Sequence, residues 1–190
     1  RRRSSTPLSL PNLMKRRDFL ATAPAAVAAG SLLAAASAPA RIVNTASMTY
    51  ASGRIDFANL QSEKSFSGTS AYANSKLCNV LFTRELARRL EGTGVTANCF
   101  HPGFVATRLG HQDGGIQGVW GMSTAGALSP EQGSRTLVYL ATSPEVDSIS
   151  GQYFSSSRQE RLTRDAMDDA LAANLWTESE RIGTTPQKTV

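Results

Sequence analysis

The strongest constraint on this 190-residue chain is a helical pattern at residues 72–90 that lies between two strand-like segments. Its apolar positions recur at near-helical spacing and predict one buried face, made of Leu77, Val80, Leu81, Leu86 and Leu90. Its charged positions are expected outside that face, namely Arg84, Glu85, Arg88 and Arg89. Residues 41–47 and 94–100 are typical of short strands, the first of them buried in a parallel sheet. Together these elements predict an α/β fold in which the helix packs on the sheet.

Local signals predict the later elements. Ser129 and Pro130 predict the N-cap and the first position of a helix that runs to Ala141. Residues 152–154 predict a last short strand. Residues 158–182 predict an amphipathic tail helix or a pair of helices.

Tyr72 and Lys76 stand one helical turn apart in the sequence Tyr-Ala-Asn-Ser-Lys. At this spacing both side chains project from the same face of a helix. A lysine ammonium beside a phenol favours the phenolate, and such a phenol can exchange a proton with an alcohol or carbonyl oxygen. The pair therefore indicates the proton-transfer half of a hydride transfer. The alternative is that Tyr72 is a packing residue and Lys76 a solvated surface charge.

Two further candidate segments follow the predicted strands, at the sheet edge where open α/β sheets bind ligands. Ser47 ends the first strand, so its hydroxyl could hydrogen-bond a substrate oxygen, although a serine in this position is more often a turn residue. Pro102 and Gly103 follow the second strand and predict a tight turn whose backbone approaches a ligand closely. Thr107 could cap the following turn or contact an amide group of a cofactor.

Ser47, Tyr72-Ala-Asn-Ser-Lys76 and the Pro102-Gly103-x-x-x-Thr107 turn occur in the order typical of the short-chain dehydrogenase/reductase family. The longer pattern, over roughly residues 32–182, resembles the retinol-dehydrogenase-like branch of that family. The resemblance implies a Rossmann-type, doubly wound parallel sheet. It also implies NAD or NADP as cofactor, with NADP slightly favoured, and interconversion of a small apolar alcohol with its aldehyde or ketone.

By this resemblance the catalytic residues would be Ser47, Tyr72 and Lys76. Ser47 would orient the substrate oxygen, and Tyr72 would be the general acid and base. Lys76 would stabilise the Tyr72 phenolate and hold the nicotinamide ribose, so that Tyr72 and Lys76 also bind the cofactor. The nicotinamide itself would be lined by one turn, made of Pro102, Gly103, Val105 and Thr107.

The sequence pattern lacks the cofactor half of such an enzyme. The family places a Gly-x-x-x-Gly-x-Gly turn for the cofactor pyrophosphate ahead of the first strand recognised above. Residues 1–40 contain no such turn, and the glycines within residues 114–118 suit a flexible loop. We therefore expect residues 31–183 to be the C-terminal part of an incomplete Rossmann domain, followed by a frayed tail at residues 184–190.

Two functions are compatible with that pattern. The first is an NAD(P)-dependent oxidoreductase of the short-chain dehydrogenase type, although we expect the 190-residue polypeptide on its own to be inactive. The alternative is a catalytically dead fragment or fusion, or an exported protein that retains only the C-terminal half. A non-enzymatic binding protein is disfavoured, because it has no need of the three residues of a proton relay.

The net charge of +5 arises entirely at the start of the chain. Residues 1–40 carry six basic side chains and one acidic one, whereas residues 41–190 carry 14 of each sign. We therefore expect no nucleic-acid partner. Residues 1–30 are expected to be a disordered or signal-like head.

Residues 14–40 resemble a twin-arginine export signal, because Lys15, Arg16 and Arg17 precede an alanine-rich apolar stretch. A competing interpretation makes residues 31–40 the end of a helix that leads into the first strand. The predicted localisation is cytoplasmic, or periplasmic if residues 14–40 act as an export signal.

Three smaller predictions concern residues outside the main motif. Cys78 and Cys99 form neither a metal-ligand spacing nor a disulfide framework, so we expect buried free thiols and no metal site. His101 is expected to be structural rather than catalytic. The helix at residues 72–90 could also form a homodimer, although core packing alone explains its apolar face.

Overall fold

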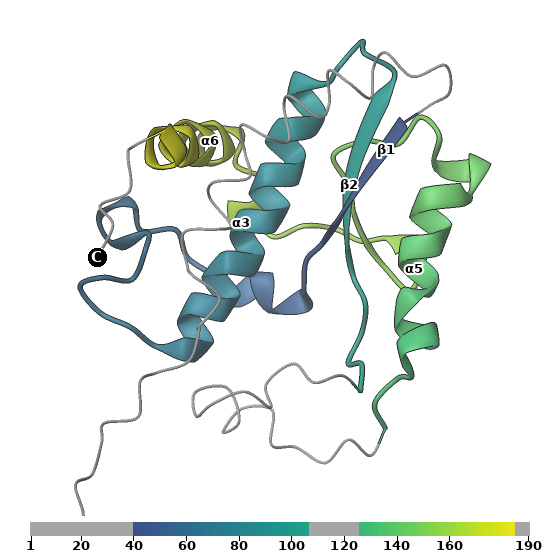
Figure 1. Ribbon diagram of the computed structural model, residues 1–190, viewed down its shortest axis with the longest axis horizontal. Coiled ribbons are helices and arrows are strands. Elements are labelled where there is room, and N and C mark those ends of the chain that lie inside the picture. The colour runs from purple at the N-terminus through teal and green to yellow at the C-terminus, as the bar shows by residue number, and fades with distance from the viewer. Residues whose placement is uncertain (1–39, 107–125, 185–190) are drawn as a thin grey trace, which may run out of the picture.

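The computed structural model describes residues 40–106 and 126–184. Its sheet has the strand order β1-β2-β3-β4 (Figure 1). The strands are β1 (Ala40–Thr45), β2 (Val95–His101), β3 (Tyr153–Ser155) and β4 (Arg158–Gln159). The helices are α3 (Gly68–Arg89), α5 (Pro130–Thr142) and α6 (Asp169–Thr184), and short 3₁₀ turns occupy parts of the connections.

The first three strands are parallel, which confirms the predicted α/β class. β1 pairs with β2 in a register that runs from Ala40 opposite Val95 to Thr45 opposite Phe100. α3 lies in the connection between these two strands, as expected for a parallel crossover. β2 pairs in parallel with β3. The strands predicted at residues 41–47, 94–100 and 152–154 are therefore present.

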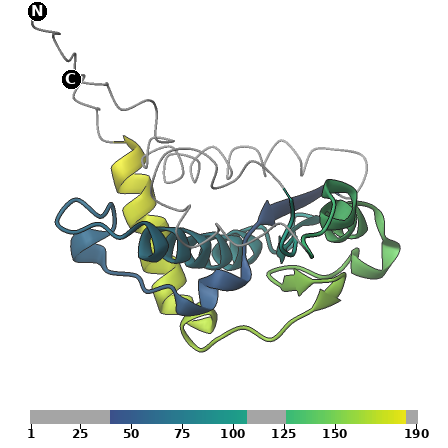
Figure 2. The same cartoon turned by 90° about the horizontal axis from the view of Figure 1, so that it is seen from below.

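Helices cover both faces of the sheet, as Figures 1 and 2 show. Alternate strand residues point to opposite faces, and each set packs on its own helices. On the α3 and α6 face, one apolar cluster joins Ile42, Val95, Ala97, Leu86 and Trp176. On the α5 face, another cluster joins Val43, Phe100, Phe154, Leu140 and Val146. The arrangement agrees with the doubly wound architecture expected from the sequence.

α3 buries every apolar residue that the helical pattern assigned to its core face, namely Leu77, Val80, Leu81, Leu86 and Leu90. The helix begins earlier than predicted, at Gly68, because the Ser67 side chain accepts a hydrogen bond from the Ser70 N–H as an N-cap. Tyr72 consequently lies in its second turn.

Glu85 corrects one expectation for α3. The pattern placed this carboxylate outside, but the residue is only 2% exposed. Its Oε1 and Oε2 accept hydrogen bonds from Arg88 Nη2 and Nε at 2.8 and 2.9 Å, and Oε1 also accepts one from Arg89 Nε at 2.6 Å. Burial alone would raise the pKa of the carboxyl, but the two guanidinium groups outweigh it and hold that pKa below its usual value. Pairing with two arginines thus allows this carboxylate to be buried, although the helical periodicity alone predicts that it faces solvent.

The N-terminus of α5 confirms its prediction. Ser129 is the N-cap, and Pro130 occupies the first helical position. The Ser129 hydroxyl accepts a hydrogen bond from Gln132 N at 3.2 Å, while Gln132 Oε1 accepts one from Ser129 N at 2.8 Å. These two bonds form a capping box. The helix therefore starts at a defined residue beside the ends of β1 and β2.

The segment after β3 corrects the predicted all-parallel sheet and the predicted tail helix. Ser156 and Ser157 have φ values of 50° and 58°, and this left-handed pair reverses the chain into β4, which is antiparallel to β3. The pair lacks the glycine or asparagine that usually marks such a turn. The tail helix begins only at Asp169.

The described residues test the prediction for the two cysteines but not the predictions for the two ends of the chain. Cys78 and Cys99 are buried free thiols, as predicted, and burial raises the pKa of each to about 12. The signal-like head at residues 1–30 and the tail at residues 185–190 lie outside the described residues. Within residues 40–106 and 126–184, none of the helices has the length and apolar character needed to cross a membrane.

Gly53 provides a test of how closely the segment after β1 approaches α3. A Cβ at this buried position would lie 2.7 Å from Ala73 O and 2.9 Å from Leu77 Cβ. We expect Gly53→Ala to lower the free energy of unfolding by about 1–3 kcal/mol, because the added methyl group overlaps the helix. Ala51→Ser, at an exposed neighbouring position, is the control and should change little. Urea unfolding measures both, and equal stability of the two variants would contradict the close approach.

Candidate active site

A cleft of about 460 Å³ opens at the carboxyl ends of β1 and β2. Its walls come from residues that follow β1, from the second and third turns of α3, from the turn after β2 and from the start of α5. Six of the seven predicted site residues line it, namely Ser47, Tyr72, Lys76, Pro102, Gly103 and Val105. The seventh, Thr107, lies outside the described residues. Segments far apart in the sequence therefore meet at the sheet edge where ligands of α/β folds bind.

Ser47 follows β1 directly and is buried, with 4% exposure. The backbone holds it there, because Ala46 N donates to Phe100 O at 2.8 Å and extends the pairing with β2. Ser47 also caps the 3₁₀ turn η1 (Met48–Ser52). Its Oγ accepts hydrogen bonds from the Thr49 N–H at 3.3 Å and from the Thr49 hydroxyl at 3.1 Å. With both contacts accepted, the Ser47 hydroxyl hydrogen can be donated to a substrate oxygen.

Tyr72 and Lys76 lie on the same side of α3, both half-buried and both lining the cleft. The Lys76 Nζ atom lies 5.4 Å from the centroid of the Tyr72 ring, within the range of a cation–π contact. Burial lowers the pKa of the Lys76 ammonium. The spacing predicted from the helix periodicity is thus realised in the fold.

The turn after β2 forms the wall opposite α3, and Leu128 holds it in place. Ala106 N donates to Leu128 O at 2.9 Å, and Leu128 N donates to Phe104 O at 2.7 Å. Gly103 has a φ of 91°, and a Cβ there would lie 2.5 Å from Leu128 Cδ1. Glycine is therefore favoured by the left-handed backbone, and its missing Cβ leaves room for the Leu128 side chain.

Three further residues with side chains suited to ligand contact line this cleft, although the sequence motifs assigned none of them to the site. Met48 and Phe104 are large apolar side chains with 66% and 39% exposure. Both side chains add apolar surface to the cleft. His101, assigned a structural role, also lines the cleft, and burial lowers the pKa of its imidazole. Adjacency to Ser47 and to the Pro102-Gly103 turn is the sequence signal that could have found all three.

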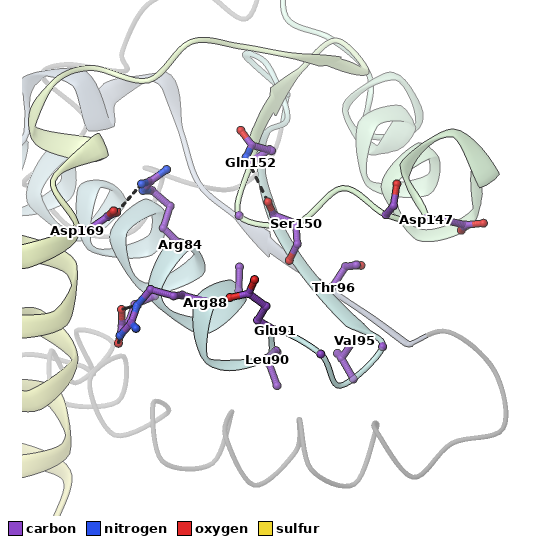
Figure 3. A pocket seen from close by; sticks show the side chains of 16 residues that line it. Arg84, Arg88, Leu90, Glu91, Val95, Thr96, Asp147, Ser150, Gln152 and Asp169 are labelled. Carbon is purple, nitrogen blue, oxygen red and sulfur yellow. Dashed lines mark hydrogen bonds and ion pairs between the residues drawn. The ribbon is translucent and has the colours of Figure 1, made fainter.

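Figure 3 shows a second pocket, of about 530 Å³, at the opposite end of the sheet. The end of α3, the start of β2 and residues 147–152 line it. Some of its charges are paired with one another, as in the 2.6 Å contact between Arg84 Nη2 and Asp169 Oδ1. None of the predicted site residues lines this pocket, so its larger volume does not make it the better candidate.

Comparison with known proteins agrees with this geometry. Residues 25–114 match the family described as short chain dehydrogenase. This chain belongs to the short-chain dehydrogenase family. Human retinol dehydrogenase 14 is 47% identical to it over 148 residues, which are 76% of this chain and 44% of that protein. Human retinol dehydrogenase 13 is 40% identical over 154 residues, which are 77% of this chain and 46% of that protein.

A solved structure is also similar to this short-chain dehydrogenase chain. The crystal structure of an uncharacterised protein from Mycobacterium paratuberculosis superposes with a TM-score of 0.57 at 28% sequence identity. The match covers 76% of this chain and 50% of that one. The chain thus spans about half the length of the proteins it matches, or somewhat less.

The residues that line the cleft of this chain fit the nicotinamide end of a dinucleotide cofactor. Gly103 leaves the backbone of one wall without a side chain, and the half-buried Lys76 supplies a hydrogen-bond donor on the other. Tyr72 lies beside Lys76 on the same wall. These are the residues that would hold the nicotinamide and its ribose. The described residues do not include a glycine-rich turn for the pyrophosphate.

The lowered pKa of Lys76 predicts a pH dependence of stability. The folded state releases the Lys76 proton at a lower pH than the unfolded state, whose lysine titrates near 10.5. Below the folded-state pKa the penalty for burying the ammonium is fully present, and it is relieved as the pH rises toward the unfolded value. We expect the stability of Lys76→Met relative to the unmodified chain to fall between pH 7 and pH 10.5.

Thermal unfolding midpoints of the two proteins across this range measure the effect. Lys64→Met, at an exposed position, is the matched control for the loss of a lysine and should show no comparable trend. A stability difference between Lys76→Met and the unmodified chain that stays constant with pH would contradict the buried ammonium.

Proposed function

We propose that this chain carries the catalytic part of an NAD(P)-dependent oxidoreductase that interconverts an alcohol and a carbonyl compound. The observation that carries the proposal is that Ser47, Tyr72 and Lys76, from two separate segments, line one cleft. Membership of the short-chain dehydrogenase family supports the same chemistry.

The geometry suggests a role for each side chain. In the direction of oxidation, Ser47 donates a hydrogen bond to the substrate oxygen, and the Tyr72 phenolate accepts the proton of the substrate hydroxyl. Lys76, positioned beside the Tyr72 ring, stabilises that phenolate. A bound nicotinamide supplies the redox chemistry by exchanging a hydride with the carbinol carbon. In reduction Tyr72 returns the proton to the alkoxide oxygen.

We propose an apolar alcohol, aldehyde or ketone as substrate. Met48 and Phe104 present exposed apolar surface at the cleft, and Phe100 lines its interior. The names of the retinol dehydrogenases among its relatives support a retinoid-type compound, and NADP is slightly favoured as the cofactor. A cytoplasmic location, the periplasmic alternative and a homodimer through α3 stay predictions.

Replacement of the phenol tests the assignment of Tyr72. We expect Tyr72→Phe to lower turnover by about 10²- to 10⁴-fold, the range that positioned acid–base groups contribute. The assay uses residues 40–190 fused behind the part of human retinol dehydrogenase 14 that precedes its matched segment. Tyr139→Phe is the matched control, because the Tyr139 hydroxyl donates to Glu145 Oε2 at 3.0 Å on the surface of α5. Undiminished turnover of Tyr72→Phe would refute the proposed function.

The second proposal concerns the 190-residue polypeptide by itself. We expect it to bind NADPH negligibly and to be inactive, because the described residues do not include a glycine-rich turn for the cofactor pyrophosphate. Binding is measured by adding the polypeptide to NADPH and following the NADPH fluorescence. A dehydrogenase of known NADPH affinity is the positive control. Saturable binding at low micromolar concentration would show that the polypeptide is competent without further sequence.

A further inference from the structure

A network of polar side chains joins α3 to the end of β1. Asn79 Nδ2 donates a hydrogen bond to Thr45 O at 2.9 Å. One turn further along the helix, Asn44 Nδ2 donates to Thr83 Oγ1 at 2.9 Å, and the Thr83 hydroxyl donates to Asn79 O at 2.7 Å. Thr83 is fully buried. Two consecutive strand residues are thereby tied to two consecutive turns of the helix.

This network lies between the two parts of the candidate active site. Thr45 is two residues before Ser47, and the Thr45–Asn79 bond is the contact of the network nearest to Ser47 in the sequence. Asn79 is three residues after Lys76 and seven after Tyr72, so all three share one face of the helix. A single hydrogen bond therefore connects the backbone beside Ser47 to the helix surface beside Lys76.

We propose that Asn79 is a positioning residue, which sets the placement of Ser47 relative to Tyr72 and Lys76. The proposal rests on the proposed function of these three residues. Asn79 acts through the backbone carbonyl of Thr45 and needs no contact with substrate or cofactor. Its role is to fix the end of β1, which leads into Ser47, against the part of α3 that carries Lys76.

The physical reason is that apolar packing alone does not set this placement. Most of the other contacts of α3 with the sheet belong to apolar clusters, and the hydrophobic effect is non-directional. A helix that slides by one residue moves its side chains by about 1.5 Å, and misplacement by about 1 Å can cost a hundredfold in rate. A hydrogen bond restricts both distance and angle, so the Asn79–Thr45 bond limits such sliding.

A second observation indicates that Asn79 does more than stabilise the folded state. Its Oδ1 atom is buried and has no hydrogen-bond partner among the described residues. An unsatisfied buried acceptor destabilises the folded state, whereas an apolar side chain in its place would not. The donor end of the Asn79 amide bonds the Thr45 carbonyl, whereas its acceptor end has no partner among the described residues, so the side chain acts through its tie to β1.

Amide hydrogen exchange of the 190-residue chain tests the positional part of the proposal without any need for activity. In Asn79→Ala we expect the amides of Ala46 and Thr49 to exchange about tenfold faster, because the end of β1 loses the tie nearest to Ser47 and keeps only the Asn44–Thr83 bond. Amides within β2 should keep their rates. Asn74→Ala is the matched control, since Asn74 Oδ1 accepts a hydrogen bond from Arg54 N at 2.8 Å on the same helix but away from β1. Equal acceleration in β1 and β2 would reveal global destabilisation and overturn the proposal.

A double-mutant cycle tests the catalytic part in the fusion enzyme described above. We expect Asn79→Ala to lower kcat by about tenfold with little change in the KM for the cofactor, and Asn74→Ala to leave kcat unchanged. In a Ser47→Ala background the effect of Asn79→Ala should disappear, because there is no hydroxyl left to position. The same loss of kcat in both backgrounds would overturn the proposal. Failure of the proposed function itself appears separately, as undiminished turnover of Tyr72→Phe.

Discussion

The parallel pairing of β1 with β2 is the constraint on which the rest of the structure depends. The register that places Thr45 opposite Phe100 brings the ends of both strands to one edge of the sheet. Ser47 follows one strand end and the Pro102-Gly103 turn follows the other, so a single pairing creates two walls of the cleft. The crossover through α3 then supplies the third wall, with Tyr72 and Lys76.

Two kinds of force act at this cleft, and they serve different purposes. Apolar clusters on both faces of the sheet provide most of the driving force for folding, but they set position only loosely. Directional contacts define the site more closely. The Ser47 cap of η1, the tie of Leu128 to the turn after β2 and the Asn79–Thr45 bond are of this second kind. Chemistry that needs near-contact distances depends on them.

The charged groups of α3 show how context decides whether burial is tolerated. Glu85 is almost completely buried, yet its pKa stays low because Arg88 and Arg89 donate to its carboxylate. Lys76 is half-buried with a lowered pKa, and its ammonium lies over the Tyr72 ring instead of against a carboxylate. The first arrangement stabilises the helix end, whereas the second keeps a positive charge beside the tyrosine that we propose as the acid–base group. The arrangement at Lys76 is typical of a functional site, where a group that lowers stability is kept because the reaction needs it.

Local patterns in the sequence were sufficient to predict the three parallel strands, the core face of α3, the Ser129 cap and the placement of Tyr72 and Lys76 on one face of a helix, whereas the other candidate site residues depended on the family resemblance. Each of these follows from a short period, a cap or a motif spacing, which residues close in the sequence determine. The antiparallel β4, the burial of Glu85 and the Asn79 tie were decided only by the tertiary structure. Each depends on contacts between distant segments or on a turn without its usual residues. Periodicity cannot report such contacts, because the partner of a side chain is set by how the sheet and helices pack.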